Sequence, residues 1–146
     1  MNYQTFSTKE TIALAKSIAA KLQGGDIVLL EGDLGAGKTT FAKGLAEAFG
    51  IKEDIVSPTF TLMQVYPVPK NDRNITELIH IDTYRLDNEQ SLIDIGAMDY
   101  LGEPNTISII EWPEKVSSLL KEKKTIHIAL HHEEKSTRTI TVNHLP

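Results

Sequence analysis

The sequence predicts an α/β fold: a three-layer sandwich with a mainly parallel central sheet, helices on both faces, and antiparallel hairpin strands added to the sheet. Three observations support this fold class. Residues 26–31 form a short, almost wholly apolar run, which is typical of a strand buried on both faces of a parallel sheet. A glycine-rich loop and a helical pattern follow that run directly. A second strongly apolar strand is predicted at residues 106–110.

Helices are predicted on either side of the first apolar strand. In residues 8–22 the apolar side chains recur at helical spacing, and Ser7 or Thr8 is placed to cap the helix. Residues 23–25 end it. The helix after the glycine-rich loop is predicted to run to about Phe49 and to stop at Gly50.

Two antiparallel hairpins are predicted, each from two strands that flank a polar turn. Residues 61–66 and 77–81 flank the turn-like residues 70–74. Residues 125–130 and 137–142 alternate apolar and polar side chains and form the second pair. Both hairpins are antiparallel additions to the parallel core.

Two short helices are predicted in the second half of the chain. The first lies around residues 89–93 and is broken by Gly96. The second covers residues 114–122 and has Val116, Leu119 and Leu120 on one face. Together with the strands they complete a βα order that suits a layered α/β protein.

Length and composition exclude several classes of protein. A chain of 146 residues predicts one domain, residues 1–146, with 40% apolar and 24% charged residues. We find no signal-peptide pattern and no apolar stretch long enough for a membrane span, so a cytoplasmic location without membrane partners is expected. The absence of cysteine excludes disulfides, cysteine-ligated zinc and thiol catalysis. A net charge of −5 disfavours direct binding of nucleic acid, so another protein would hold any RNA involved.

One motif carries most of the chemistry. Residues 32–39, GDLGAGKT, fit the phosphate-binding pattern G-x-x-x-x-G-K-S/T at every fixed position, and they lie between a strand and a helix, as the pattern requires. This makes the fold of the P-loop NTPase type. The glycines let backbone N–H groups face a phosphate, and the helix directs the positive end of its dipole at the same anion. Lys38 is expected to reach the β- and γ-phosphates, and the Thr39 hydroxyl to bind Mg²⁺.

Hydrolysis or transfer also needs an acidic residue near the metal. Asp82 and Glu111 each follow four mostly apolar residues, so both are expected at the carboxyl ends of strands, where ligands of this fold class bind. The residues alone do not decide which of the two holds magnesium. Each could also be an ordinary charged residue that caps a strand. His80 is predicted to share a strand face with Asp82.

Other polar and aromatic residues nearby allow a plainer interpretation. Tyr84 and Trp112 suit core or rim aromatics as well as a nucleotide site, and Arg85 suits a surface ion pair equally well. His131 and His132 would face opposite ways on a strand, which favours a solvated edge over a metal site.

Four blocks together resemble one family. GDLGAGKTT (32–40), SPTFT (57–61), HIDTYRL (80–86) and EWPE (111–114), in this order and in a short chain, are similar to the bacterial TsaE family, also called YjeE. The resemblance implies an ATPase that uses ATP and Mg²⁺ and assists threonylcarbamoyladenosine synthesis on tRNAs that read codons beginning with A. It also implies action with the TsaD and TsaB proteins, while TsaC supplies the activated threonylcarbamoyl group.

The resemblance also implies roles for individual residues. Lys38 and Asp82 would be catalytic, with Asp82 at the hydrolytic water, while Thr39 and Glu111 would bind the metal. Segment 57–61 would act as a nucleotide-sensing switch, and residues 8–11 would touch the base. The residues implied to bind the nucleotide are Leu34, Gly35, Ala36, Gly37, Lys38, Thr39, Thr40 and Trp112. Nothing is implied for the chain beyond residue 124.

Two alternatives remain open at this point. The first is a P-loop small-molecule kinase, although such enzymes usually clamp the phosphoryl group with several lid arginines and this chain has only Arg73, Arg85 and Arg138. The second is a nucleotide-dependent binding module without useful hydrolysis. None of the three arginines has an obvious finger role, so turnover without partners is expected to be slow. No base-reading motif distinguishes ATP from GTP.

Overall fold

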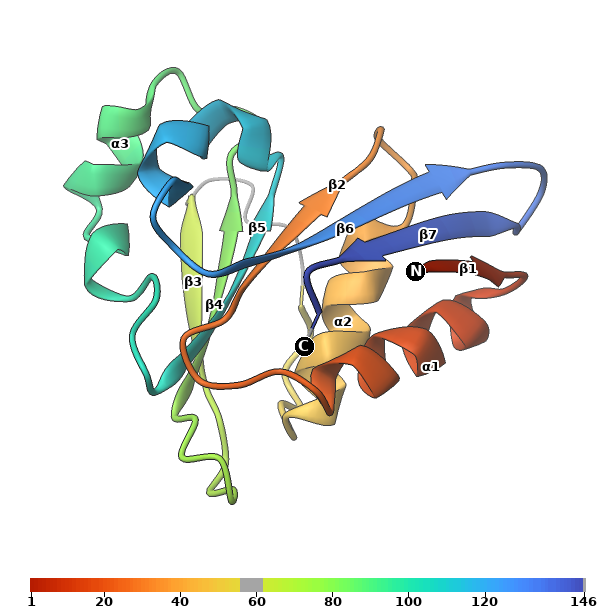
Figure 1. Cartoon of the computed structure of the whole chain (residues 1–146), viewed down its shortest axis with the longest axis horizontal. Helices are drawn as coiled ribbons and strands as arrows, with labels where there is room; N and C mark the ends of the chain where they lie inside the picture. The colour runs from red at the N-terminus through yellow and green to blue at the C-terminus, as the bar shows by residue number, and fades with distance from the viewer. Residues whose placement is uncertain (56–61, 146) are drawn as a thin grey trace.

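The structure is a computed structural model of the whole chain, and residues 1–55 and 62–145 are described (Figure 1). The predicted switch at residues 57–61 lies outside the described residues. The described strands form one seven-stranded sheet in the order β1-β7-β6-β2-β5-β4-β3. Their bounds are β1 (Asn2–Thr5), β2 (Ile27–Glu31), β3 (Met63–Pro67), β4 (Glu77–Asp82), β5 (Thr106–Glu111), β6 (Thr125–His132) and β7 (Arg138–Asn143).

The centre of the sheet is parallel and its borders are antiparallel. Strand β2 pairs in parallel with both β5 and β6, and β5 pairs in parallel with β4. Strand β3 joins β4 as one antiparallel hairpin, and β7 joins β6 as the other. The predicted α/β class and both predicted hairpins are therefore confirmed.

Helices cover both faces of the sheet, so the molecule has three layers (Figure 1). Alternation along the strands separates two cores: Val28 and Leu30 of β2 pack with the helices of one face, while Ile27 and Leu29 pack with those of the other. One face carries α1 (Thr8–Ala19) and α2 (Lys38–Ala48), and the other carries α3 (Glu89–Asp94) and the 3₁₀ helices η1 (Ala97–Asp99) and η2 (Pro113–Leu120).

The helix boundaries differ in part from the prediction. Ser7 caps α1 as expected, since its hydroxyl accepts the N–H of Glu10 at 3.1 Å. The helix ends at Ala19, before the predicted Leu22, because the N–H of Leu22 bonds to the carbonyl of Ala19 in a tighter turn. Leu22 remains buried, so the apolar pattern continues past the end of the α-helix.

Two further elements departed from the prediction. The helix expected at residues 114–122 is the 3₁₀ helix η2, which starts at Pro113 and kinks at Val116. Strand β1 was missed. It is a four-residue, largely polar edge strand that pairs with β7, and such pairing between the two ends of the chain leaves no local signal. None of the described helices is long and apolar enough to span a membrane.

Candidate functional site

The glycine-rich loop leaves the carboxyl end of β2 in a conformation that requires glycine. Gly32, Gly35 and Gly37 have φ angles of +152°, +82° and +104°. A Cβ atom on Gly32 would lie 2.5 Å from the carbonyl oxygen of Leu130, so the loop packs directly on β6. Leu34 is 69% exposed, so its side chain is not packed against the loop or the core. The loop conformation and the helix that follows it suit an anion.

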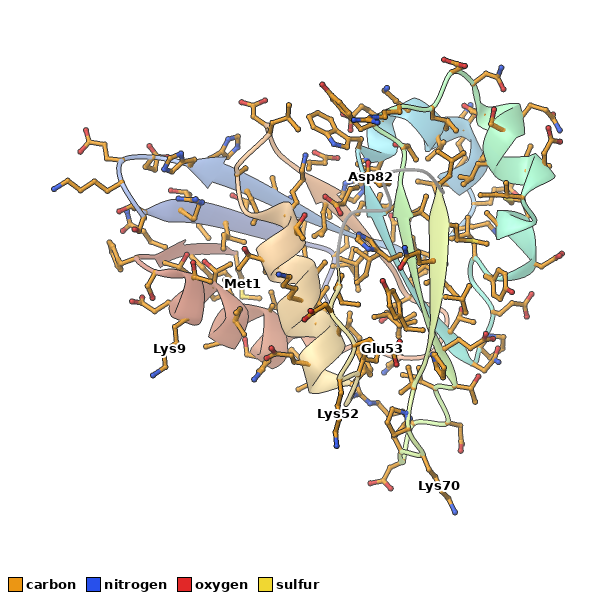
Figure 2. The ribbon with its side chains drawn as sticks, turned by 180° about the vertical axis from the view of Figure 1, so that it is seen from behind. Met1, Lys9, Lys52, Glu53, Lys70 and Asp82 are labelled. Carbon is orange, nitrogen blue, oxygen red and sulfur yellow. The ribbon has the colours of Figure 1, made fainter. Side chains whose placement is uncertain are left out.

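Register brings the two acidic residues to the same edge as the loop. Strand β5 lies between β2 and β4, and Glu111 is paired with Leu30 on one side and with Asp82 on the other. Neighbouring residues of a parallel sheet share a face, so both carboxyl groups belong to the face covered by α1 and α2. Figure 2 shows Asp82 at this edge, far from Lys70 in the turn between β3 and β4. The edge predicted from the sequence thus collects both acids.

Lys38 begins α2 and is almost wholly buried at this edge. Its ammonium donates to the carbonyl oxygen of Gly32 at 2.5 Å and lies 3.4 Å from the centre of the Trp112 ring. Burial lowers the pKa of Lys38, and the carboxylates of Glu111 and Asp82 oppose that shift. An acceptor and an aromatic face thus hold the cation at the mouth of the loop.

Glu111 is oriented by His80, for which the sequence predicted only a strand face shared with Asp82. The Nε2 atom of His80 lies 2.6 Å from Oε2 of Glu111, and both side chains are buried. The Nδ1 atom of His80 has no hydrogen-bond partner among the described residues. A neutral ring that donates from Nε2 explains both facts, because a bare lone pair is then the group left without a partner. The signal for this contact was the shared face of His80 and Asp82 combined with the register of β5.

Asp82 lies at the end of β4 with one carboxylate oxygen accepting the N–H of Tyr84 at 3.0 Å. Burial raises the pKa of Asp82, and the charge of Glu111 raises it further. The bond from Tyr84, the nearby His80 and the positive charge of Lys38 act in the opposite direction. The result is a half-buried carboxyl group that takes up a proton more readily than an exposed aspartate.

The aromatic residues form the rim of the site. Trp112 has a left-handed backbone, with φ +60°, and the hydroxyl of Thr83 donates to its carbonyl oxygen at 2.5 Å. The rings of Tyr84 and Trp112 are 5.0 Å apart, and Tyr84 is partly exposed. Lys115 donates to the carbonyl of Tyr84. The rim interpretation of Tyr84 and Trp112 therefore holds for their location, and Trp112 also contacts Lys38.

The terminal hairpin contributes a side chain that the motifs did not indicate. Arg138, the first residue of β7, donates from Nε to the carbonyl oxygen of Ala36 at 3.0 Å. Beside it, the loop, the start of α1 and the hairpin turn line a hollow of about 100 Å³. The lining residues are Ser7, Thr8, Thr11, Gly37, Thr40, Lys135, Ser136 and Arg138.

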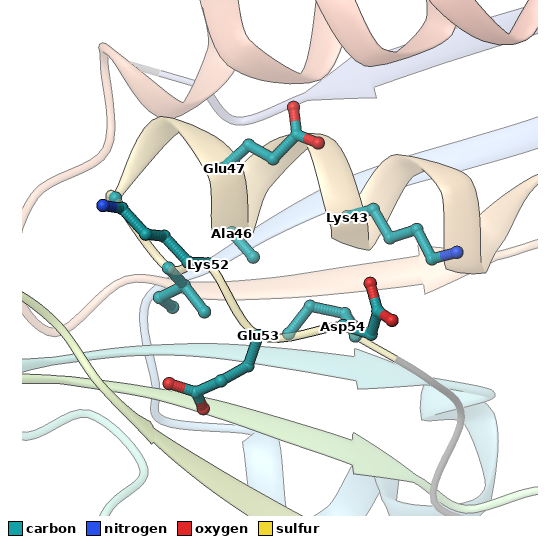
Figure 3. Close-up of a pocket in the computed structure, with 9 residues that line it drawn as sticks. Lys43, Ala46, Glu47, Lys52, Glu53 and Asp54 are labelled. Atoms are coloured by element: carbon teal, nitrogen blue, oxygen red, sulfur yellow. The ribbon is translucent and has the colours of Figure 1, made fainter.

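A larger hollow, of about 410 Å³, lies elsewhere. It is lined by the C-terminal half of α2 and by residues 50–55 (Figure 3). Lys43, Glu47 and Lys52 give it charges of both signs. None of the predicted site residues in the described part of the chain lines it, so the chemistry of the loop belongs to the other end of α2.

A metal ion at this site would take only a few ligands from the protein. Among the described residues no group of three or more His, Cys, Asp or Glu side chains could hold an ion. Mg²⁺ does not require such a cage, because it commonly takes one or two protein oxygens and completes its shell with phosphate and water. Thr39, in the first turn of α2, and Glu111, oriented by His80, offer a hydroxyl and a carboxylate that fit this pattern.

The comparisons with known proteins agree with this geometry. A family model described as "Threonylcarbamoyl adenosine biosynthesis protein TsaE" matches residues 5–140. The chain belongs to the TsaE family.

Similar TsaE proteins are found in several bacteria. The tRNA threonylcarbamoyladenosine biosynthesis protein TsaE of Bacillus subtilis is 37% identical over 141 residues, which is 97% of this chain and 84% of that protein. The protein of the same name from Treponema pallidum is 40% identical over 136 residues, covering 93% of this chain and 95% of its own length. The crystal structure of YdiB from B. subtilis matches with a TM-score of 0.75 and 33% identity, over 97% of this chain and 83% of that one.

Proposed function

We propose that this TsaE protein is a Mg²⁺-dependent ATPase that acts in the threonylcarbamoyladenosine modification of tRNAs reading codons that begin with A. The observation that carries the proposal is the row formed by Leu30, Glu111 and Asp82, which sets two carboxyl groups beside the loop that begins after β2. A loop alone would bind nucleotide. An ordered carboxylate and a second acid of raised pKa beside the loop support hydrolysis, because phosphoryl transfer to water uses an acidic group near the metal and another near the water.

Binding of the triphosphate would use the loop and the start of α2. Backbone N–H groups of residues 34–40 would hold the phosphates, and Lys38 would leave the carbonyl of Gly32 for the β- and γ-phosphates. The hollow beside Thr8, Thr11 and Thr40 is available to the ribose or base. Trp112 lies against Lys38 and would border the nucleotide.

Thr39 and Glu111 would hold Mg²⁺, which would neutralise charge on the β- and γ-phosphates. His80 would keep the Glu111 carboxylate in place through the 2.6 Å bond. Asp82 would accept a proton from water as that water attacks the γ-phosphorus and the bond to the bridging oxygen breaks. The raised pKa of Asp82 favours this step, because a base closer in pKa to the working pH accepts a proton more effectively.

The pathway assignment is supported by the family and by the names of its relatives, which are called tRNA threonylcarbamoyladenosine biosynthesis proteins. The net charge of −5 argues that tRNA is held by partners and not by this chain. We therefore propose that it acts on or with the TsaD–TsaB complex and that its turnover is slow in isolation.

The arginines weigh against a small-molecule kinase. Arg73 is committed to carbonyls at the end of α1, and Arg138 to carbonyls of the loop. Of the three arginines, only Arg85 is exposed and makes no hydrogen bond with the described residues. One arginine is too few for a lid that excludes water. With ATP and a metabolite pool, release of labelled free phosphate favours the ATPase, and label in a small organic phosphate would favour the kinase.

The decisive experiment compares Asp82→Ala with Asp87→Ala, an exposed acid nearby that serves as the control. Trp112 is the sole tryptophan, so its fluorescence can report ATP binding. We expect both variants to bind ATP as the wild type does, and hydrolysis by the Asp82 variant to fall about 10²-fold or more. Unchanged turnover would reject the role given to Asp82.

The role in the pathway is tested by adding purified TsaD and TsaB. We expect the complex to raise ATP hydrolysis and tRNA modification to require it. If a non-hydrolysable ATP analogue supports full modification, the protein is a nucleotide-dependent binding module and the ATPase proposal fails.

A further inference from the structure

We propose that Arg138 of the terminal hairpin is a positioning residue for the phosphate loop, an inference that rests on the proposed ATP site. Its guanidinium holds two consecutive loop carbonyls from outside: Nε donates to Ala36 at 3.0 Å and Nη2 to Gly35 at 3.4 Å. The contact joins residues about a hundred positions apart in the chain. None of the sequence motifs includes this part of the molecule.

The planar peptide bond explains how the contact with Arg138 orients the N–H groups of the loop. A trans peptide is planar, so its carbonyl and the N–H of the next residue point in opposite directions. Fixing the carbonyl of Ala36 toward the hairpin turns the N–H of Gly37 away from it, to the side where a bound phosphate would lie. The preceding peptide is held at both ends, because the N–H of Ala36 also donates to the carbonyl of Asp33 at 3.0 Å. Arg138 therefore prepares the loop before nucleotide arrives.

The guanidinium is itself held on a rigid element. Arg138 is paired with Thr5 of β1 and with His132 of β6, so its backbone is fixed within the sheet. Its Nη1 atom donates to the carbonyl oxygen of Thr137 at 3.3 Å. A Cβ on Gly37 would lie 3.5 Å from Nε of Arg138, which shows how closely the side chain follows the loop. The hairpin thus supports the loop from the side, and β6 lies next to β2 in the sheet (Figure 1).

The contact also brings a positive charge to the loop. Arg138 forms no ion pair with any described carboxylate, so its guanidinium is not bound to an acidic side chain. A polyphosphate in the loop would be attracted by that charge in addition to Lys38. The hydrogen bonds fix the direction of the loop carbonyls, and the charge increases the affinity for a polyphosphate.

The chain offers a matched control. Arg73 also donates to two main-chain carbonyls, those of Ala19 and Leu22, at 2.7 and 2.8 Å, but it does so at the opposite end of the sheet. Arg73→Gln should lower stability and leave nucleotide affinity unchanged. Arg138→Gln should weaken binding of both ADP and ATP about tenfold or more, since bonds from a charged donor are lost.

The experiment measures ADP and ATP affinity by calorimetry and amide hydrogen exchange in the loop without nucleotide. For Arg138→Gln we expect weaker binding together with faster exchange at Gly37. Arg138→Lys keeps the charge but not the fork, so its affinity should lie between those of the wild type and the Gln variant. Affinity of Arg138→Gln within twofold of the wild type would overturn the inference.

Two further outcomes are also decisive. If Arg138→Gln does not fold, the Lys variant decides: affinity equal to the wild type overturns the inference, and reduced affinity supports it. If the wild-type protein binds neither ATP nor ADP, the proposed ATP site fails and this inference fails with it. Wild-type binding with an unaffected Arg138→Gln removes only the inference.

Discussion

The two ends of the parallel strands are built differently, although both are held by polar side chains. At the amino end, the side-chain amide of Asn71 is fully hydrogen-bonded. It donates to the carbonyls of Pro69 and Ile75 and accepts the N–H groups of Arg73 and Ile75. At the carboxyl end, Lys38 holds one carbonyl and an aromatic face, and the Nδ1 atom of His80 has no partner among the described residues. The amide of Asn71 therefore has all its polar atoms paired, whereas the His80 ring at the carboxyl end keeps one nitrogen unpaired.

This difference teaches where stability and where binding are concentrated. A closed network of neutral and main-chain groups fixes loops at modest cost. Buried or half-buried ionisable groups with shifted pKa values, such as Lys38 and Asp82, are costly and are common where a ligand is bound or transformed. Substitutions at the amino end should therefore change stability alone, while those at the carboxyl end should change nucleotide binding.

The largest expected effect comes from a glycine at each end. A Cβ on Gly24 would lie 1.8 Å from the carbonyl oxygen of Pro104, and one on Gly32 would lie 2.5 Å from that of Leu130. We expect Gly24→Ala and Gly32→Ala each to lower the free energy of unfolding by about 3 kcal/mol, because the backbone must move apart. Urea unfolding measures this. Only Gly32→Ala should also lose ADP binding. If both variants lose ADP binding equally, the two ends of the strands do not differ in their role.

A smaller effect is expected from the closed network. Asn71→Ala should lower the free energy of unfolding by about 2 kcal/mol, since partly buried main-chain groups lose their partners. Nucleotide affinity should not change. The exposed neighbour Asp72 provides the control, and Asp72→Ala should stay within about 0.5 kcal/mol of the wild type. Weaker ATP binding by the Asn71 variant would show that the two ends are coupled.

The smallest expected effect is an increase in the free energy of unfolding. Burial raises the pKa of Asp82, so the folded protein holds this proton more tightly than the unfolded chain does. Stability is therefore lost as pH rises from the ordinary aspartate value, about 4, through the raised folded value. Asp82→Asn removes this loss and still accepts the N–H of Tyr84, so it should be slightly more stable than the wild type at pH 7 and equal to it at about pH 3.

Urea titrations of Asp82→Asn at the two pH values provide the measurement. The same variant should not hydrolyse ATP, which would show stability given up for function. If the variant is less stable than the wild type at neutral pH, the raised pKa is not the cause of a stability cost at this site.

Much of the architecture could be predicted from local signals. The apolar composition of residues 26–31 and 106–110 indicated central parallel strands, and the polar turns indicated both hairpins. The loop pattern placed Lys38 in a loop between a strand and a helix, and the ends of two apolar runs placed Asp82 and Glu111 at the edge of the sheet. These predictions succeeded because composition, periodicity and turn chemistry act over a few neighbouring residues.

Other features could not be predicted from local signals alone. The pairing of β1 with β7, the bond between His80 and Glu111, and the contact of Arg138 with the loop all join residues far apart in the chain. Helix η2 also differed from its pattern, because Pro113 and the kink at Val116 changed its geometry while its apolar side chains stayed buried.

The sequence by itself determined that this chain has a phosphate loop between a strand and a helix, that two later strands end in carboxyl groups, and that it resembles TsaE proteins. Only the tertiary structure decided which groups meet there: strand order set Glu111 between Leu30 and Asp82, and the terminal hairpin delivered Arg138 to the loop. The physical reason is range. Periodicity and turns are read from neighbours, whereas contacts across a sheet depend on register and packing that the whole chain settles together.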